Sequence, residues 1–202
     1  MNPYPTLYVD AVGKFVEESG PLNPGVRLEH SDMLDSEHMI VAHGCNAQGA
    51  MGSGAALAVI TKYPANKKTY QDRHRLKPLR LGEVVWHVEL RKNRVIANCI
   101  TQEFFGGGGR RYVDYDAIEE SYSTVAKVAL AKGWKAISTC QVGSGLAGGD
   151  WTIILSTLEK VAFEYGITII VHQPDQQAYL NACEHYRTHS HAKRPQAKAD
   201  TI

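Results

Sequence analysis

The 202-residue sequence has few cysteines, no long apolar run and almost no net charge, and each absence excludes a class of protein. Its four cysteines, Cys45, Cys99, Cys140 and Cys183, lie far apart without a C-x-x-C pair, which fits reduced thiols. No apolar run approaches the roughly 18 residues of a membrane span. The opening MNPYPTLYVD lacks the basic and apolar regions of a secretory signal. We therefore expect a cytoplasmic protein with no membrane partner.

Charge and length limit the remaining possibilities. The net charge is +1, so bulk electrostatics attract neither nucleic acid nor membrane, and we expect no strong general nucleic-acid binding. Any bound anion must be held by local groups. The length fits one sizeable domain with a real core. We predict an N-terminal extension over 1–25, a domain over 26–184 and a flexible His- and Lys-rich tail over 185–202.

Short apolar runs alternate with amphipathic helical patterns along the chain. Strands are expected at 38–45, 82–90, 94–100, 135–142 and 167–173. Helices are expected at 55–63, ended by Pro64, at 118–130, ended by Gly133, and at 151–162, ended by Gly166. The stretch 10–19 looks like an added helix. This alternation predicts a layered α/β domain with a largely parallel central sheet.

Two glycine-rich loops, 49–54 and 141–151, each follow a predicted strand and precede a predicted helix. Glycines allow backbone N–H groups to converge, and a helix N-terminus adds partial positive charge. In a parallel sheet both loops lie at the carboxyl ends of strands, where ligands bind. The pair suits a diphosphate, whereas the alternative is that the glycines only permit tight turns.

A dinucleotide-binding fold and a cysteine phosphatase are both rejected. Gly143-x-Gly145-x-x-Gly148 matches the dinucleotide fingerprint, but only one β-α-β unit follows it. The next strand-end acid, Asp175, lies about thirty residues on instead of about twenty. No cysteine is followed by Arg at the spacing of a phosphate-binding cysteine loop.

Two further patterns are given ordinary structural interpretations. Asp114 and Asp116 of the DYD motif open a helix, so an N-cap is the better interpretation than an aspartyl-phosphate nucleophile. His185, His189 and His191 have a spacing that a metal could use, but they belong to a solvated tail. No metal site is expected in the core.

The motifs LEHSDML (28–34), IVAHGCNAQGAMGSGAALAVITKYP (40–64), IANCITQ (96–102), RRYVDYDAI (110–118) and VGSGLAGGDW (142–151) together resemble a macro domain. The resemblance covers about residues 26–173. It is strongest to the microbial and phage branch described as ADP-ribose 1″-phosphate phosphatases, which lies near macro domains that cleave ADP-ribose from glutamate or DNA. It implies a three-layer α/β/α sandwich with a mixed, largely parallel sheet, binding ADP-ribose and needing no cofactor.

The resemblance also implies which residues touch ADP-ribose. Asp32 matches the acceptor of the adenine amino group, with Met33 beside it. His43 and Asn46 fall where the family has polar groups near the distal ribose. The first loop contributes Gly52, Ser53 and Gly54, and the second contributes Val142, Gly143, Ser144, Gly145, Leu146 and Ala147 around the diphosphate.

Two departures argue against one branch of the family. The glutamate- and DNA-directed hydrolases have a lysine where this chain has Gln102. The glutamate-directed enzymes also have an aspartate where this chain has Ala147. Glutamine cannot form the covalent sugar adduct proposed for that lysine, so the lysine route is absent.

Three residues are candidates for chemistry. His43 is a candidate general acid or base, Asn46 could orient the ribose or phosphate, and Asp150 could activate water. Each has a structural alternative, namely a hydrogen-bonded core histidine, a turn residue and a helix N-cap. Arg110 and Arg111 follow four glycines and could reach a terminal phosphate from a mobile lid, or could lie in a solvated loop.

Three functional hypotheses follow. The first is metal-independent hydrolysis of ADP-ribose 1″-phosphate to ADP-ribose and phosphate. The second is a reader that binds ADP-ribose without chemistry. The third is a lysine-independent hydrolase of ADP-ribosyl adducts on protein or nucleic acid. The first and second share every predicted binding residue, so they differ only in whether His43, Asn46 and Asp150 converge on one water.

Overall fold

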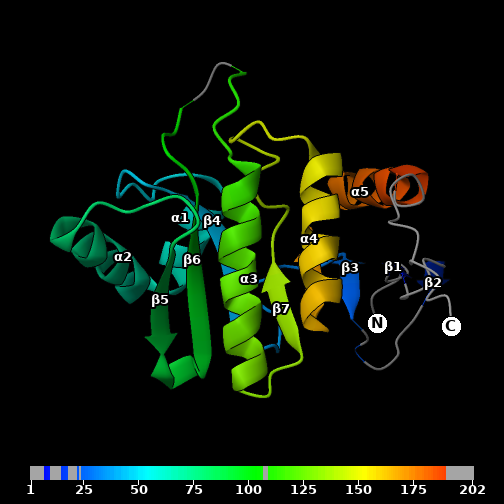
Figure 1. Ribbon diagram of the computed structural model, residues 1–202, viewed down its shortest axis with the longest axis horizontal. Coiled ribbons are helices and arrows are strands. Elements are labelled where there is room, and N and C mark those ends of the chain that lie inside the picture. Colours follow the sequence, from blue (N-terminus) through cyan, green and yellow to red (C-terminus); the bar gives the residue numbers. More distant parts are fainter. Residues whose placement is uncertain (1–6, 10–14, 18–21, 23, 107–108, 190–202) are drawn as a thin grey trace, which may run out of the picture.

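The computed structural model describes residues 7–9, 15–17, 22, 24–106 and 109–189, in which strands and helices alternate (Figure 1). The strands are β1 (Leu7–Val9), β2 (Phe15–Glu17), β3 (Gly25–Glu29), β4 (Ile40–Asn46), β5 (Val84–Glu89), β6 (Arg94–Gln102), β7 (Ala136–Thr139) and β8 (Thr168–His172). The helices are α1 (Gly54–Lys62), α2 (Pro64–Leu76), α3 (Tyr115–Ala131), α4 (Trp151–Tyr165) and α5 (Gln176–His189), with a 3₁₀ turn, η1 (Leu90–Lys92).

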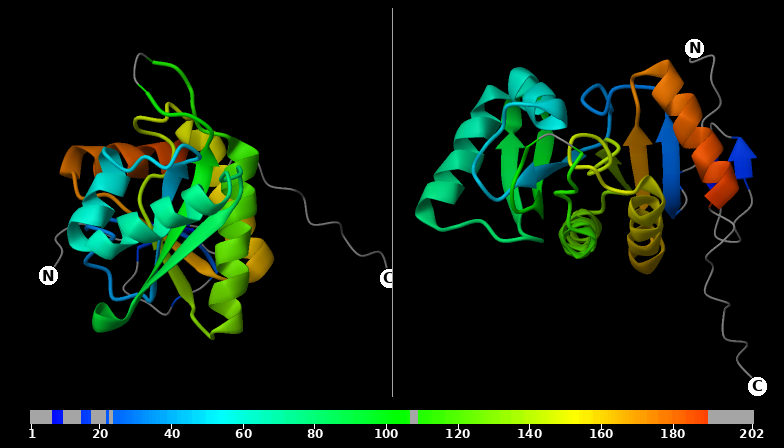
Figure 2. Two further views of the ribbon diagram at one scale, coloured as in Figure 1. Left: turned by 90° about the vertical axis from the view of Figure 1, so that its left-hand side faces the viewer. Right: turned by 90° about the horizontal axis from the view of Figure 1, so that it is seen from above.

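The described strands form one mixed sheet in the order β2-β1-β3-β8-β7-β4-β6-β5. The central pairs β3–β8, β8–β7, β7–β4 and β4–β6 are parallel, and the outer pairs are antiparallel. Helices α3 and α4 cover one face of the sheet, and α1, α2 and α5 lie on the other side (Figure 2). The predicted three-layer α/β/α sandwich is therefore confirmed.

The central strands are largely apolar because helices cover both of their faces. All five residues of β8 are buried, and six of the seven residues of β4 are buried. The largest core cluster packs α3 and α4 against the sheet. Apart from the added helix over 10–19, each expected strand and helix is present, within a few residues of its predicted ends.

Helix α2 has no counterpart among the predicted elements, because Pro64 begins a helix as well as ending one. Helix α1 stops at Lys62, and Pro64 takes the first position of α2, where its missing N–H costs nothing. Only Asn66 and Tyr70 of α2 are buried, so the segment carries almost no apolar periodicity. Helix α5 was likewise not predicted, and it continues through His189 into the expected tail.

The added helix expected over 10–19 is wrong for its described part. Residues Phe15–Glu17 form strand β2, which pairs antiparallel with β1, and β1 continues the sheet beside β3. An open sheet edge offers unpaired backbone groups, and pairing with them outweighs a local helical pattern. Residues 10–14, 18 and 19 lie outside the described residues.

The parallel strands place three loops at one end of the sheet. Strand β4 lies between β6 and β7, so the segments that follow these three strands meet at their carboxyl ends. Among the helices described, none is long and apolar enough to cross a membrane.

Candidate functional site

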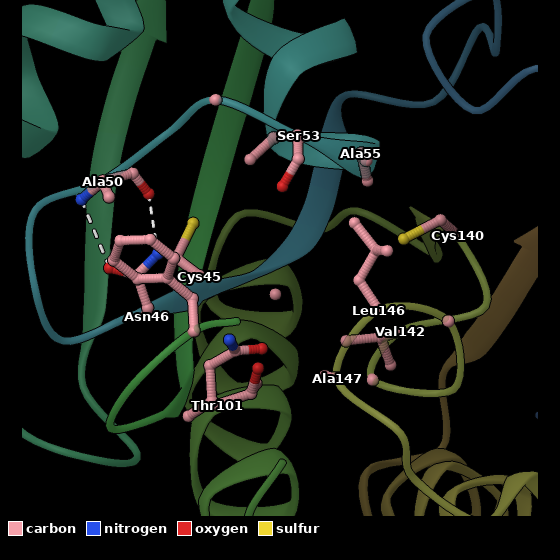
Figure 3. A pocket seen from close by; sticks show the side chains of 18 of the residues that line it. Cys45, Asn46, Ala50, Ser53, Ala55, Thr101, Cys140, Val142, Leu146 and Ala147 are labelled. Atoms are coloured by element: carbon pink, nitrogen blue, oxygen red, sulfur yellow. Dashed lines mark hydrogen bonds between the residues drawn. The ribbon is translucent and has the colours of Figure 1, made fainter. Parts of the chain in front are cut away.

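A cavity of about 680 Å³ lies at the carboxyl ends of β4, β6 and β7 (Figure 3). We call it the loop cavity. Its lining residues are Gly44, Cys45, Asn46, Ala50, Gly52, Ser53, Gly54, Ala55, Ala56, Thr101, Gln102, Phe105, Gly106, Cys140, Gln141, Val142, Gly143, Gly145, Leu146 and Ala147. Both predicted glycine loops therefore face one space, as expected from their positions after parallel strands.

Asn46 shapes the first loop. The pairing of β4 with β6 shifts register between Cys45 and Asn46, which turns the chain out of the sheet. The Asn46 Oδ1 atom accepts hydrogen bonds from the backbone N–H groups of Gln48 at 3.0 Å and Ala50 at 3.2 Å. Its Nδ2 donates to the Ala50 carbonyl at 2.7 Å, as Figure 3 shows. The Asn46 side chain thus closes the loop and keeps one N–H for the cavity.

Helix α1 presents an uncapped N-terminus to the loop cavity. Ser53 occupies the N-cap position, yet its side chain makes no capping hydrogen bond. Within the described chain, the N–H groups of Gly54, Ala55 and Ala56 have no acceptor, and all three residues line the cavity. Free N–H groups at a helix N-terminus carry partial positive charge, so this end of the cavity favours an anion.

The second loop is built by glycines that let it fold tightly onto the core. Gly143 has a φ of 72°, and a Cβ there would lie 2.7 Å from Val113. The Gly149 N–H donates to the Gly143 carbonyl at 2.8 Å, and the Gly148 N–H donates to the Gly145 carbonyl at 2.9 Å. These bonds leave the N–H groups of Gly145, Leu146 and Ala147 without acceptors among the described residues. The loop therefore adds a second set of free donors to the cavity.

Asp150 caps helix α4 and does not line the loop cavity. Its Oδ1 accepts the Thr152 N–H at 2.7 Å, and hydrogen bonds to Thr152 lower the pKa of its carboxyl. The N-terminus of α4 is thus satisfied by its own side chain, unlike that of α1. Of the two helix N-termini expected to hold an anion, only α1 lines the cavity.

His43 is completely buried beneath the loop cavity and does not line it. Its Nε2 is 2.8 Å from Asn98 Oδ1, and its Nδ1 is 3.7 Å from Cys45 Sγ. Burial lowers the pKa of His43 to about 4, so the imidazole is neutral near pH 7. His43, Asn46 and Asp150 therefore do not converge on one point, because only Asn46 faces the cavity.

Comparison with known proteins is consistent with this architecture. The family profile described as Macro domain matches residues 42–158, more than half of the chain. The chain belongs to the macro domain family. A Candida glabrata protein named ADP-ribose 1″-phosphate phosphatase is 33% identical over 158 residues, spanning 64% of this chain and 88% of that protein.

Solved macro domain structures share the fold. The macrodomain of Thermus aquaticus DarG superposes with a TM-score of 0.64 at 19% identity, covering 74% of this chain and 98% of that one. Thermosipho africanus DarTG, whose structure is a complex with ADP-ribose, matches with a TM-score of 0.64 at 18% identity. That match covers 78% of this chain and 44% of the Thermosipho chain.

The predicted adenine contacts of this macro domain lie beside the loop cavity instead of in its wall. Asp32 Oδ1 accepts the Leu34 N–H at 2.8 Å, and Met33 is buried. Asp32 is close enough to Cys140, which lines the cavity, to influence its thiol. Burial, with a smaller contribution from Asp32, raises the pKa of Cys140 to about 11. Ser144 also lies outside the lining, since its hydroxyl donates to the Gln141 carbonyl at 3.0 Å.

The described lining of the loop cavity in this macro domain contains no Asp, Glu, His, Lys or Arg. Neither Arg110 nor Arg111 belongs to it, and the Arg111 guanidinium lies 5.0 Å from the centre of the Tyr115 ring. Among the described residues, no group of three or more His, Cys, Asp or Glu could hold a metal ion. His185 instead contacts Thr152 Oγ1 at 2.9 Å and stacks on His189.

Among the lining side chains that were not predicted, five lie at the ends of the central strands. These are Cys45, Thr101, Gln102, Cys140 and Gln141, each at or just beyond the carboxyl end of β4, β6 or β7. Gln102 was considered only as a replacement for lysine, and its Nε2 donates to the Phe104 carbonyl at 2.7 Å. The general rule that ligands bind at strand carboxyl ends would have found these positions.

Proposed function

We propose that this macro domain binds ADP-ribose in the loop cavity, with the diphosphate held by backbone N–H groups. The observation that carries the proposal is the pair of free donor sets, one at the α1 N-terminus and one at Gly145, Leu146 and Ala147, on either side of one cavity. Such donors hold phosphate without a lysine or arginine. A cavity of about 680 Å³ falls within the range of nucleotide-sized ligand sites.

The absence of charged side chains from the described lining fits this ligand. A dianionic diphosphate tolerates no nearby carboxylate, and none lines the cavity. The remaining lining is apolar or neutral, with Val142, Leu146 and Phe105 available to cover the ribose rings. Asp32 and Met33 would contact the adenine at the edge of the site, where their backbone leads into β4.

Hydrolysis of ADP-ribose 1″-phosphate is the second candidate function. It is supported by the name of the Candida glabrata relative, which is 33% identical over most of its length. In this reaction water attacks phosphorus or the anomeric carbon, and ADP-ribose and inorganic phosphate are released. The described lining supplies no side chain that titrates near pH 7, so loop N–H groups would have to stabilise the transition state.

A lysine-dependent hydrolysis of ADP-ribosyl adducts is not proposed. Gln102 lines the cavity where the family's lysine would lie, and an amide nitrogen cannot attack the sugar. Ala147 lines the cavity as well and carries no acid. A lysine-independent route remains a third candidate with no side chain assigned to it.

The same proposal includes a cytoplasmic location and a macro domain that spans residues 26–184. The four cysteines are free thiols, and three are buried, which fits the reducing cytoplasm. The family match begins at Ala42 and ends at Leu158, inside the predicted domain of 26–184.

Two measurements on one protein sample test the proposal. Isothermal titration calorimetry with ADP-ribose should show one-to-one binding, and adenosine monophosphate, which lacks the diphosphate, should bind at least about tenfold more weakly. A phosphorus NMR time course with ADP-ribose 1″-phosphate and no added metal then separates the two functions. Growing inorganic phosphate supports the phosphatase, and shifted diphosphate signals without phosphate release support a reader. No heat and no shift would overturn the ADP-ribose assignment.

A further inference from the structure

A second hollow lies at the other end of the sheet from the loop cavity. It has a volume of about 530 Å³ and sits at the amino ends of the parallel strands, between β5, η1 and the end of α3. Its lining residues are Met39, Trp86, Val88, Glu89, Leu90, Asn93, Arg94, Val95, Val128, Lys132 and Trp134. We call it the tryptophan groove, since it contains two of the three tryptophans of the chain.

The groove combines flat aromatic surface with exposed apolar side chains. Val88 is 56% exposed and Leu90 is 84% exposed. Among the described residues, neither the Trp86 nor the Trp134 indole N–H has a hydrogen-bond partner, and neither is a buried unsatisfied donor. Trp86 and Trp134 are partly buried and pack against the core, and the surface they keep lies in the same hollow as the exposed Val88 and Leu90, which is typical of a binding surface.

The rim of the groove is basic. Arg94 and Lys132 line it, and Arg91 belongs to the η1 turn whose Leu90 also lines it. Lys92 of the same turn is directed instead to the Lys62 carbonyl and the Tyr63 ring. Within the described chain the Lys132 ammonium makes no ion pair. The one acid in the lining, Glu89, accepts the Arg91 backbone N–H at 3.3 Å and lies 4.0 Å from His87. The Glu89 carboxylate is therefore engaged by residues of its own strand and turn.

One stretch of the chain is strongly basic although the whole chain is nearly neutral, and its η1 part borders the groove. Residues 62–94, which span α2, β5 and η1, contain ten of the 22 Lys and Arg residues but only three of the 21 Asp and Glu residues. Their net charge of +7 leaves −6 on the rest of a chain whose total is +1. The expectation of no strong nucleic-acid binding was based on the net charge of the whole chain. That net charge does not show that positive charge is concentrated in residues 62–94.

We propose that the tryptophan groove binds single-stranded nucleic acid, with bases stacked on Trp86 and Trp134 and phosphates paired with Lys132 and the basic η1 turn. Aromatic platforms beside a basic surface are the general means of holding single strands without sequence preference. A duplex keeps its bases stacked internally and cannot reach the indole rings. An acidic peptide without aromatic residues would use the charges but has no flat rings to stack on the two indoles.

The test measures binding of fluorescein-labelled dT12 and U12 by fluorescence anisotropy at low salt. Binding should weaken steeply with added NaCl, because phosphate contacts release counterions. A twelve-base-pair duplex should bind at least about fivefold more weakly, and saturating ADP-ribose should not displace the oligonucleotide. In the Trp151→Phe protein, where only the groove tryptophans remain, oligonucleotide should quench the emission.

Matched variants locate the site. Trp134→Ala should weaken binding at least about fivefold, as expected for loss of one stacked base. Lys132→Glu should do the same, whereas Lys127→Glu, on the same helix but outside the groove, changes the net charge equally and should have little effect. Circular dichroism confirms that each variant folds.

Three results would overturn the proposal. They are no salt-sensitive binding of either oligonucleotide, equal weakening by Lys132→Glu and Lys127→Glu, or displacement by ADP-ribose. The last would assign nucleic acid to the loop cavity. Because the groove and the loop cavity lie at opposite ends of the sheet, failure here leaves the ADP-ribose proposal untouched, and the reverse also holds.

Discussion

The Oδ1 atom of Asn98 accepts a hydrogen bond from Nε2 of His43 at 2.8 Å, in the fully buried layer beneath the loop cavity. The orientation of the Asn98 amide follows from its other partners, since its Nδ2 donates to the Val85 carbonyl and to Asn66 Oδ1. Nε2 of His43 must therefore carry the proton, and Nδ1 is left to accept from the Cys45 thiol. His43 lies beneath the cavity wall and is not among the lining residues.

This arrangement predicts a stability that falls with acid. Burial lowers the pKa of both His43 and His172 to about 4, so the unfolded chain binds more protons than the folded one between about pH 6.5 and 4. The free energy of unfolding should decrease as pH falls through this window, by up to about 1.4 kcal/mol per pH unit for each histidine. Urea unfolding at successive pH values measures the slope. In His43→Asn the slope should be smaller, and an unchanged slope would contradict the assignment.

Asp150→Ala should reduce stability without reducing affinity. The substitution removes the cap of α4 and should lower the free energy of unfolding by about 1 kcal/mol, while calorimetry gives an unchanged Kd for ADP-ribose. Asp150→Ser, which can still cap the helix, should restore most of the stability. The companion variant Asp114→Ala removes the cap of α3 and should behave alike. A large loss of affinity or turnover in Asp150→Ser would instead support a catalytic carboxylate.

Tyr70 is expected to control affinity from outside the cavity. Its buried hydroxyl, on α2, donates to the Asn46 carbonyl where the first loop leaves β4. Tyr70→Phe removes this hydrogen bond and the longer contact of 3.4 Å to Asn46 Oδ1, together worth about 1 kcal/mol, and should weaken ADP-ribose binding about fivefold. Tyr122→Phe is the matched control, because it removes a buried hydroxyl contact with Thr139 on the other face of the sheet. Equal affinities of the two variants would show that loop position does not depend on Tyr70.

Adding a methyl group to the loops should block the ligand and spare the fold. A Cβ at Gly52 or Gly145 would meet no atom within 4 Å, and both residues line the cavity. Gly52→Ala and Gly145→Ala should therefore keep the melting temperature of the parent, or raise it slightly through the unfolded state. ADP-ribose affinity should fall at least about tenfold because the methyl occupies ligand space. Unchanged affinity in both variants would place the diphosphate elsewhere.

Periodicity and glycine placement predicted the central part of the fold well. The apolar runs that form β4, β6 and β8 are buried on both faces, and strands of this kind can be predicted from their apolar composition alone. Helices α3 and α4 bury one stripe each, so their spacing was visible. Helix α2 and strand β2 were not recognised, because a nearly polar helix and a three-residue edge strand depend on neighbours that lie elsewhere in the chain.

For the site, the sequence by itself determined the two glycine loops and their meeting at one end of the sheet, since strand direction decides where loops lie. Only the tertiary structure decided which polar residues face the cavity. His43 and Cys45 share a face of β4, yet His43 is enclosed beneath the cavity and Cys45 reaches its wall. The Asp150 carboxylate caps its own helix, and the Asn46 amide closes its own loop while also lining the cavity. A side chain's hydrogen-bond partners are set by packing between distant segments, and no local pattern contains that information.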